Sequence, residues 1–147
     1  MNYKAYNGYG GFNEKGDEYE ILNTHTPVPW CNVLTNERFG TLVSTHGTVY
    51  SFYKNAGEFK LTHWCNDWAD FKSGEVFKGI FDTNYNLTYG FGYVKLRSEI
   101  GNIERYMDIF VPINDDVKIH YIKIKNNRAI DKEVVIEYTP DMVLGVA

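Results

Sequence analysis

Tryptophan, asparagine, aspartate and arginine side chains gather between Thr26 and Asp67 in this chain of 147 residues. A sugar ring presents an apolar C–H face that can lie on an indole ring, and its hydroxyls hydrogen-bond to paired polar side chains. These residue types therefore indicate a surface for sugars. The alternative, which composition alone favours, is that the tryptophans fill a sandwich core and Asn66-Asp67 forms a turn.

Two glycines interrupt a second aromatic cluster, Tyr89-Gly90-Phe91-Gly92-Tyr93. Glycines in a strand approach predict a bulge or a close backbone contact, which can re-aim Tyr89 or Tyr93 toward a ligand. A nucleotide-binding loop is not indicated, because a third glycine and a following helix are missing.

Acidic residues offer little for catalysis. Glu58 could accept sugar hydroxyls or pair with Lys60 or Arg38, and the salt link is the favoured interpretation. The pairs Asp67 with Asp70 and Asp115 with Asp116 lie in turn-like sequence, where aspartate commonly makes local hydrogen bonds. We therefore predict no catalytic residue.

Metal binding is not predicted either. Cys31 and Cys65 stand in unrelated contexts and are expected to be free thiols. The four histidines are scattered, and His120 shares a strand face with Ile122 and Ile124, which favours a core or surface role over metal ligation.

Hydrophobic alternation predicts strands almost everywhere and no convincing helix. One hairpin is expected from 39–44 and 49–53, around a His46-Gly47 turn, and an opening hairpin from 9–12 and 18–22. A meander of four further strands is expected at Phe91–Glu99, Ile103–Val111, Val117–Lys125 and Lys132–Thr139.

The strand at 103–109 has two distinct faces. Its apolar residues Ile103, Met107 and Ile109 share one face, which we expect to pack, and its other face meets water or a ligand through Glu104, Tyr106 and Asp108. The expected fold is an all-β antiparallel β-sandwich with little or no helix.

Composition limits the possible partners. The chain reads as one domain, residues 1–147, with a net charge of −4 and no basic run, so nucleic acid is not an expected partner. No apolar stretch approaches the ~20 residues of a membrane helix, and the N-terminus lacks a signal-peptide core, which predicts no membrane partner and a cytoplasmic location. The apolar end, Val134 to Ala147, predicts either unpaired sheet edges that invite self-association or a frayed terminus.

Several motifs occur in one order: TPVPW at 26–30, YSFYKNAGEFKLTHWCND at 50–67, YGFGYVKLRSE at 89–99 and IFVPINDDVKIHYIKIKN at 109–126. In this order they resemble the start of the glycoside hydrolase family 94 phosphorylases, which include cellobiose and chitobiose phosphorylases and the related domains of cyclic β-1,2-glucan synthases. The resemblance implies the first part of an N-terminal super-sandwich of the galactose-mutarotase-like type, truncated on its C-terminal side.

The resemblance also implies a reaction, inverting phosphorolysis of a β-linked gluco-oligosaccharide by inorganic phosphate, with no cofactor. In the family an aspartic acid on an (α/α)6 barrel protonates the leaving oxygen, and no segment here corresponds to that barrel. Whether the chain is itself an enzyme is therefore left open, and alone it is expected to be inactive. The candidate sugar contacts are Trp30, Arg38, Glu58, Trp64, Asn66, Asp67, Tyr89 and Tyr93.

Some positions depart from the family pattern. Gly57 and Lys60 replace two arginines, Tyr89 replaces a usual histidine, and residues 70–87 are shorter than the family's long hairpin, so another β-linked glucan could replace cellobiose. Two hypotheses follow: a sandwich fragment of a phosphorylase, completed by the remainder of that protein or by self-association, or a free-standing carbohydrate-binding or scaffold domain.

Overall fold

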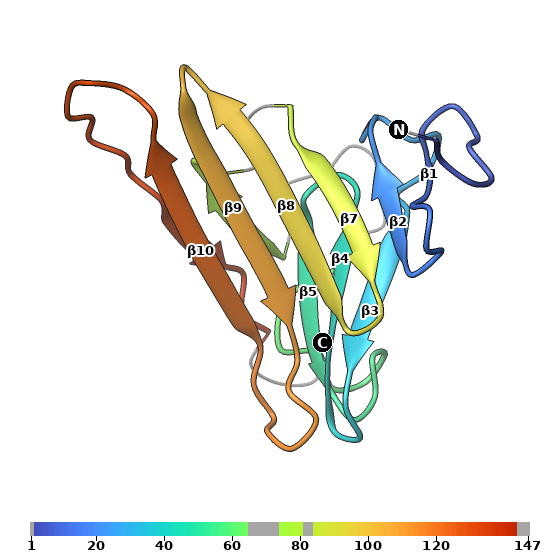
Figure 1. Ribbon diagram of the computed structural model, residues 1–147. Coiled ribbons are helices and arrows are strands. Elements are labelled where there is room, and N and C mark those ends of the chain that lie inside the picture. The colour runs from blue at the N-terminus through green and yellow to red at the C-terminus, as the bar shows by residue number, and fades with distance from the viewer. Residues whose placement is uncertain (1, 65–73, 81–83, 144–147) are drawn as a thin grey trace.

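The computed structural model describes residues 2–64, 74–80 and 84–143. These residues form eleven strands in two antiparallel sheets and contain no helix, as the sequence predicts. Figure 1 shows the six-stranded sheet in front of the five-stranded one. No helix in the described part of the chain is long and apolar enough to cross a membrane.

The six-stranded sheet has the order β1-β2-β7-β8-β9-β10. Its strands are β1 (Gly10–Phe12), β2 (Glu18–Ile21), β7 (Asn86–Gly90), β8 (Tyr93–Ile100), β9 (Ile103–Phe110) and β10 (Ile119–Asn126). The five-stranded sheet has the order β11-β6-β5-β4-β3. Its strands are β3 (Cys31–Thr35), β4 (Phe39–Ser44), β5 (Val49–Tyr53), β6 (Glu75–Lys78) and β11 (Glu137–Pro140).

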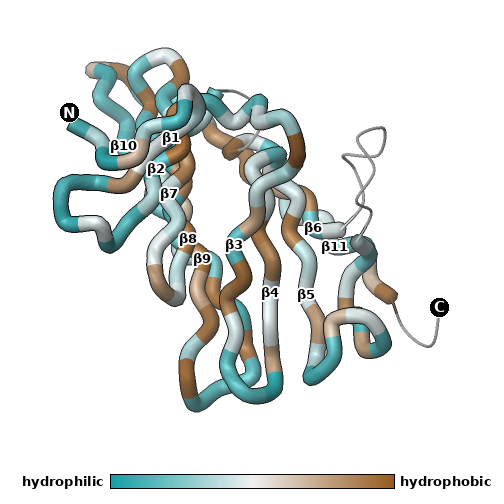
Figure 2. Tube along the Cα trace, turned by 90° about the vertical axis from the view of Figure 1, so that its right-hand side faces the viewer, coloured by the Kyte–Doolittle hydropathy of each residue, from teal (hydrophilic) through white to brown (hydrophobic). Residues whose placement is uncertain are grey.

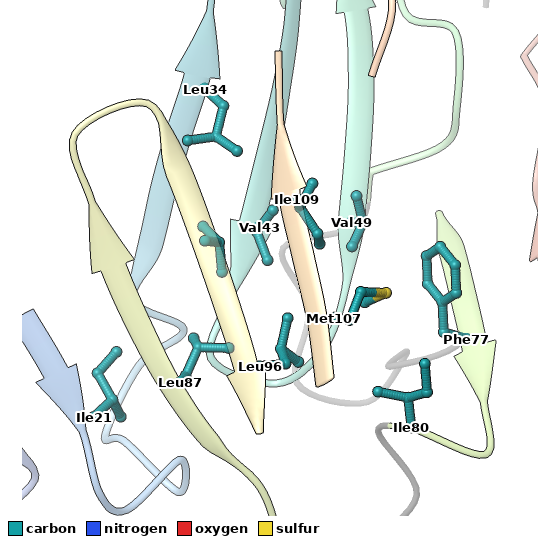
Figure 3. Packing of buried hydrophobic residues seen from close by; sticks show 11 residues of the cluster. Ile21, Leu34, Val43, Val49, Phe77, Ile80, Leu87, Leu96, Met107 and Ile109 are labelled. Carbon is teal, nitrogen blue, oxygen red and sulfur yellow. The ribbon is translucent and has the colours of Figure 1, made fainter. Parts of the chain in front are cut away.

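The core lies between the sheets. Ile21, Leu87 and Leu96 project from one sheet toward Val43 and Val49 of the other, and all five are fully buried (Figure 3). Each such side chain contributes about 1.5–3 kcal/mol by leaving water. In the turned view (Figure 2), hydrophobic segments run along β4, β8 and β9, while several surrounding loops are hydrophilic.

The expected face of β9 is confirmed, because Ile103, Met107 and Ile109 are at most 3% exposed. Both predicted hairpins are also confirmed, since β1 pairs with β2 and β4 pairs with β5. Gly47 has a φ of 81° in the second hairpin's turn, a conformation that glycine adopts without a steric penalty.

The predicted meander is wrong in its last strand. Within Lys132–Thr139 only the last three residues belong to a strand, β11, which runs on to Pro140 and pairs with β6 of the opposite sheet rather than with β10. Figure 1 shows the chain leaving β10 and crossing to that second layer. The apolar run Val134-Val135-Ile136 is a strand signal, but the crossing gives it no ladder partner, and propensity alone forms no strand.

Three strands were not predicted from the sequence pattern: β3, β6 and β7. β3 is an edge strand with mostly exposed side chains, and β7 contains Asn86, Thr88 and Gly90, residues that weaken the apolar alternation. β7 also changes the interpretation of the glycine motif. Gly90 ends β7 and Phe91-Gly92 forms the turn to β8, so the motif is a hairpin connection rather than a bulge inside one strand.

Candidate functional site

The outer face of the six-stranded sheet carries aromatic and charged side chains in rows, because residues paired across antiparallel strands share a face. Tyr93, Phe110 and Ile119 form an apolar row across β8, β9 and β10. The next row on the same face consists of Lys95, Asp108 and Tyr121, and the third of Arg97, Tyr106 and Lys123.

The first two rows border a groove of about 480 Å³. Its lining residues are Gly92, Tyr93, Lys95, Asp108, Phe110, Ile119 and Tyr121. Tyr93 also lines a second hollow, of about 370 Å³, together with Asn13, Asp17 and Glu18 of the first hairpin. Tyr93 therefore borders both hollows, whose lining residues come from several strands.

Gly90 makes room for the Tyr93 ring. A Cβ at Gly90 would lie 2.2 Å from the Tyr93 Cζ atom, so only glycine lets the ring cross β7 at this place. Asn32 of β3 fixes the hairpin from below, because its Nδ2 donates to the carbonyl oxygens of Gly90 and Tyr93 at 3.1 and 3.3 Å. The glycine motif thus makes the predicted close contact, and it directs Tyr93 rather than Tyr89 outward.

Glu18 anchors the outward ring. The Tyr93 hydroxyl donates to Glu18 Oε1 at 2.6 Å, and Lys95 forms an ion pair with the same oxygen while its Nζ lies 4.7 Å from the Tyr93 ring centroid. Hydrogen bonds from Lys95 and Tyr93 lower the pKa of Glu18, and the hydrogen bond to Glu18 raises the pKa of Lys95. Both groups are therefore ionised at neutral pH and hold the phenol in place.

The second charge pair of the groove is Arg97 with Asp108, 2.7 Å apart, and the Arg97 guanidinium lies 5.0 Å from the Tyr106 ring centroid. The acid and base groups along this groove are thus largely neutralised by one another. An arrangement of exposed rings beside paired polar groups can bind a neutral ligand that has both apolar faces and hydroxyls. No group of three or more His, Cys, Asp or Glu in the described ranges could hold a metal ion.

The glycosyl hydrolase 94 supersandwich domain matches the chain over residues 17–77 and 80–147. The chain belongs to this family. It is 26% identical to an N,N'-diacetylchitobiose phosphorylase from Vibrio furnissii and 28% identical to one from Vibrio proteolyticus, in each case over 80% of this chain and 17% of the relative. It is also 42% identical to the cyclic beta-(1,2)-glucan synthase NdvB of Rhizobium meliloti over 48% of this chain and 3% of the relative.

The supersandwich domain places Trp30 and Tyr89 away from the groove. Trp30 packs against the core, with its ring centroid 5.6 Å from that of Tyr9 and 6.3 Å from that of Tyr19. The Tyr89 hydroxyl points between the sheets and is shared by the carbonyl oxygens of Trp30 and Val43, at 2.9 and 3.0 Å. Burial raises the pKa of Tyr89 well above its ordinary value. The Tyr89 hydrogen bonds and the Trp30 ring contacts each join the two sheets.

Trp64 lies on the other side of the supersandwich domain. Its ring centroid is 5.7 Å from that of Tyr50, which alternates with the core residue Val49 and so belongs to the outer face of the five-stranded sheet. The expected salt link of Glu58 with Lys60 or Arg38 does not form among the described residues. Arg38 pairs with Asp116 at 3.1 Å, while Glu58 is exposed in the loop after β5.

Of the eight predicted sugar contacts, the structure places Tyr93 alone in the groove, while Asn66 and Asp67 lie outside the described residues. The groove adds Lys95, Phe110 and Tyr121, which sequence reasoning did not single out. Alternation along β8, β9 and β10 could have identified these residues as outward-facing. The register between the strands determines which of the outward-facing residues become neighbours. Of the two cysteines predicted to be free thiols, Cys31 is one, and burial raises its pKa to about 11, while Cys65 lies outside the described residues.

Proposed function

We propose that this supersandwich domain holds a neutral β-linked gluco-oligosaccharide in the outer-face groove, as a non-catalytic part of a glycoside phosphorylase. The observation that carries the proposal is the group of three rings, Tyr93, Phe110 and Tyr121, that line the groove beside paired charges. Two chitobiose phosphorylases among the relatives support the same ligand class.

The groove suits a chain of sugars better than a single one. Tyr93 borders both hollows, and the rings are spread over three neighbouring strands, whose spacing is about 4.8 Å. Successive sugar units can therefore lie on successive rings, with hydroxyls reaching Lys95 and Asp108. Tyr121, 59% exposed, offers the most open ring face.

Catalysis is assigned to the remainder of such a phosphorylase. The family resemblance puts the general acid on a barrel that no part of residues 1–147 resembles, with inorganic phosphate as the co-substrate. Purified protein of this sequence should release no glucose 1-phosphate from cellobiose and phosphate. Release of glucose 1-phosphate above a no-protein control would overturn the non-catalytic assignment.

A second candidate is a free-standing carbohydrate-binding or scaffold domain. It is favoured by the groove itself, whose lining residues all come from this chain. The coding sequence downstream of Ala147 distinguishes the two candidates, because an open frame for further sandwich strands and a barrel supports the phosphorylase part. For a part of a phosphorylase, we expect the remainder of the protein to pair with the sheet edges. For a free-standing domain, we expect a second copy to pair with β10, which has a described neighbour on one side only.

Calorimetric titration with a panel of β-linked gluco-oligosaccharides tests binding at the groove. Tyr121→Ala should weaken binding about tenfold, equivalent to about 1.4 kcal/mol, because a stacking face is lost. Trp64→Ala is the matched control, since it removes an aromatic ring from the opposite face of the sandwich. Loss of binding in Trp64→Ala with full binding in Tyr121→Ala would move the sugar surface to the other sheet.

A further inference from the structure

The N-terminal arm, residues 2–6, borders the six-stranded sheet at its β1 end. Lys4 pairs with Phe12 of β1, and each of the two donates its backbone N–H to the carbonyl oxygen of the other at 2.9 Å. In Figure 2 the N-terminal segment lies on the side of this sheet that faces away from the five-stranded one. The supersandwich match begins at residue 17, so the arm is a feature of this chain that the family match does not describe.

Gly11 lets the arm cross onto the outer face of the sheet. It pairs with Glu20, which shares its strand face with Glu18, the anchor of Tyr93, so a side chain on Gly11 would project outward. A Cβ there would lie 2.8 Å from the Cβ atom of Tyr3 and 3.2 Å from the Cα atom of Tyr6. The arm therefore occupies the space above Gly11, on the face that carries the groove.

Two tyrosine rings stand side by side on the arm. The ring centroids of Tyr3 and Tyr6 are 6.4 Å apart, and the ring planes differ by 27°. Ala5 lies between them with a φ of 52°, in the left-handed region where a residue with a side chain is strained. Such strain persists where surrounding contacts impose it, and it is common at ligand sites. Tyr6 is 57% exposed, so its ring is available to a ligand.

β2 holds Tyr3 in the same way as it holds Tyr93. The Tyr3 hydroxyl donates to Glu20 Oε2 at 2.7 Å, and the Tyr93 hydroxyl donates to Glu18 Oε1 at 2.6 Å. The hydrogen bond to Glu20 raises the pKa of Tyr3, so the phenol keeps its proton at neutral pH. The two glutamates are alternate residues on one face of β2, about 6.8 Å apart along the strand. Anchored rings therefore approach β2 from both sides, one from the groove and one from the arm.

The chemistry of the arm suits the same neutral ligand as the groove. An exposed tyrosine ring offers an apolar face to the C–H face of a sugar. The Glu20 carboxylate can accept sugar hydroxyls, and its negative charge repels an anion. An uncharged sugar unit can thus lie on Tyr6 while its hydroxyls reach Glu20.

We propose that the arm extends the oligosaccharide groove, with Tyr6 as a further stacking ring and Tyr3 as its support. This inference rests on the proposed function and adds the length of the ligand, a chain of several β-linked glucose units rather than a disaccharide. Four interstrand steps, about 19 Å, separate β9, which carries Phe110, from β1. A longer chain reaches from the groove to the arm, whereas a disaccharide contacts one part at a time.

Tyr6→Ala tests the arm by calorimetric titration of the whole chain with β-linked glucose chains of two and of six units. Affinity for the six-unit chain should fall about tenfold because a stacking face is lost, and affinity for the two-unit chain should not change. The urea midpoint should stay level, since Tyr6 is largely exposed. Tyr6→Phe is the matched control, because it keeps the ring, and it should bind both chains as the parent does.

Tyr121→Ala separates this inference from the proposed function. Unchanged six-unit binding in Tyr6→Ala, with weakened binding in Tyr121→Ala, would remove the arm from the site and leave the groove intact. Failure of the parent chain to bind either sugar would overturn both. A loss in Tyr6→Ala that Tyr6→Phe shares would overturn the stacking role of the ring. A loss in Tyr6→Ala with full binding in Tyr121→Ala would put the sugar on the arm alone and overturn the continuous groove.

Discussion

The same three residue types meet in two regions of this molecule with opposite surroundings. On the outer face, Glu18 accepts from Tyr93 and Lys95, which are partly exposed. Inside the sandwich, Glu75 accepts from Tyr138 at 2.9 Å and from Lys118. We call these sets the outer trio and the inner trio.

Burial is the main difference between the trios. Glu75 and the Lys118 side chain are 1% and 7% exposed, whereas the side chains of Glu18 and Lys95 are 19% and 35% exposed. Burial opposes ionisation of Glu75, but the charge and hydrogen bond of Lys118, with hydrogen bonds from Ser51 and Tyr138, outweigh it and lower the pKa of Glu75. Burial also lowers the pKa of Lys118, which Glu75 only partly offsets.

The inner trio ties the two layers together, whereas the outer trio holds an exposed ring in place. Lys118 precedes β10 of one sheet, and Glu75 begins β6 of the other. Ser51 and Thr62 donate to Glu75 Oε1 at 2.6 and 3.2 Å, so that the buried carboxylate is fully hydrogen-bonded. A buried pair of this kind gives little net stability when intact, but loss of one partner is costly.

The largest expected effect comes from Glu75→Gln. It leaves the buried Lys118 charge without its counter-ion, so the free energy of unfolding should fall by about 3–5 kcal/mol in urea denaturation. Replacing both charges by apolar residues, Glu75→Leu with Lys118→Met, should recover much of that loss. An equally unstable double variant would show that the polar network itself stabilises the fold.

His120 gives a pH test of the same interior. It lies against Phe77 and Tyr138, and burial, assisted by the Lys118 charge and partly opposed by Glu75, lowers its pKa from 6.5 to about 4. Between pH 6.5 and 4, His120 is protonated in the unfolded chain but neutral in the folded one. The free energy of unfolding is therefore highest above pH 6.5 and decreases as the pH falls. By pH 4 this decrease should reach about 3 kcal/mol.

His120→Phe is the control for this titration, because it keeps a ring against Phe77 and removes the titrating group. The unfolding free energy of this variant should vary less between pH 6.5 and 4 than that of the parent chain. Identical pH profiles would show that His120 is not the group that titrates.

The outer trio is tested through Gly90→Ala. The added Cβ meets the Tyr93 ring, which must leave its place above β7 and lose the bond to Glu18. Oligosaccharide affinity should fall about tenfold, or about 1.4 kcal/mol, by calorimetric titration. Thr88→Ala, on the same strand and the same face, should bind as the parent does, and equal affinity in both variants would remove Tyr93 from the groove.

The smallest expected effect is that of Glu18→Gln on stability. The pair with Lys95 is partly exposed, and such pairs contribute about 0–1 kcal/mol, less at high salt. Urea denaturation with and without added salt measures this contribution. If Glu18→Gln lowers the free energy of unfolding as much as Glu75→Gln does, the two trios do not differ in their contribution to stability.

Much of the fold could be predicted from local patterns. Alternation identified both hairpins and the packed face of β9, because a strand with one buried face repeats every two residues. β3 and β7 escaped because polar residues obscure their period, and the pairing of β11 depends on where the chain crosses between layers. The candidate site was harder to predict, since tryptophans that suggested sugar stacking also suit a core, and Trp30 packs against that core.

The amino-acid sequence was enough to predict the all-β class, the hairpins, the outward-facing residues of β9 and the resemblance to the family 94 phosphorylases. The three-dimensional structure was needed to show that Tyr93, Phe110 and Tyr121 share a groove, while the Tyr89 hydroxyl makes hydrogen bonds between the sheets. It also decided that Glu75 and Lys118, 43 residues apart, meet in the interior. Alternation is a local property of the chain, whereas register and layer crossing depend on contacts between residues far apart in sequence.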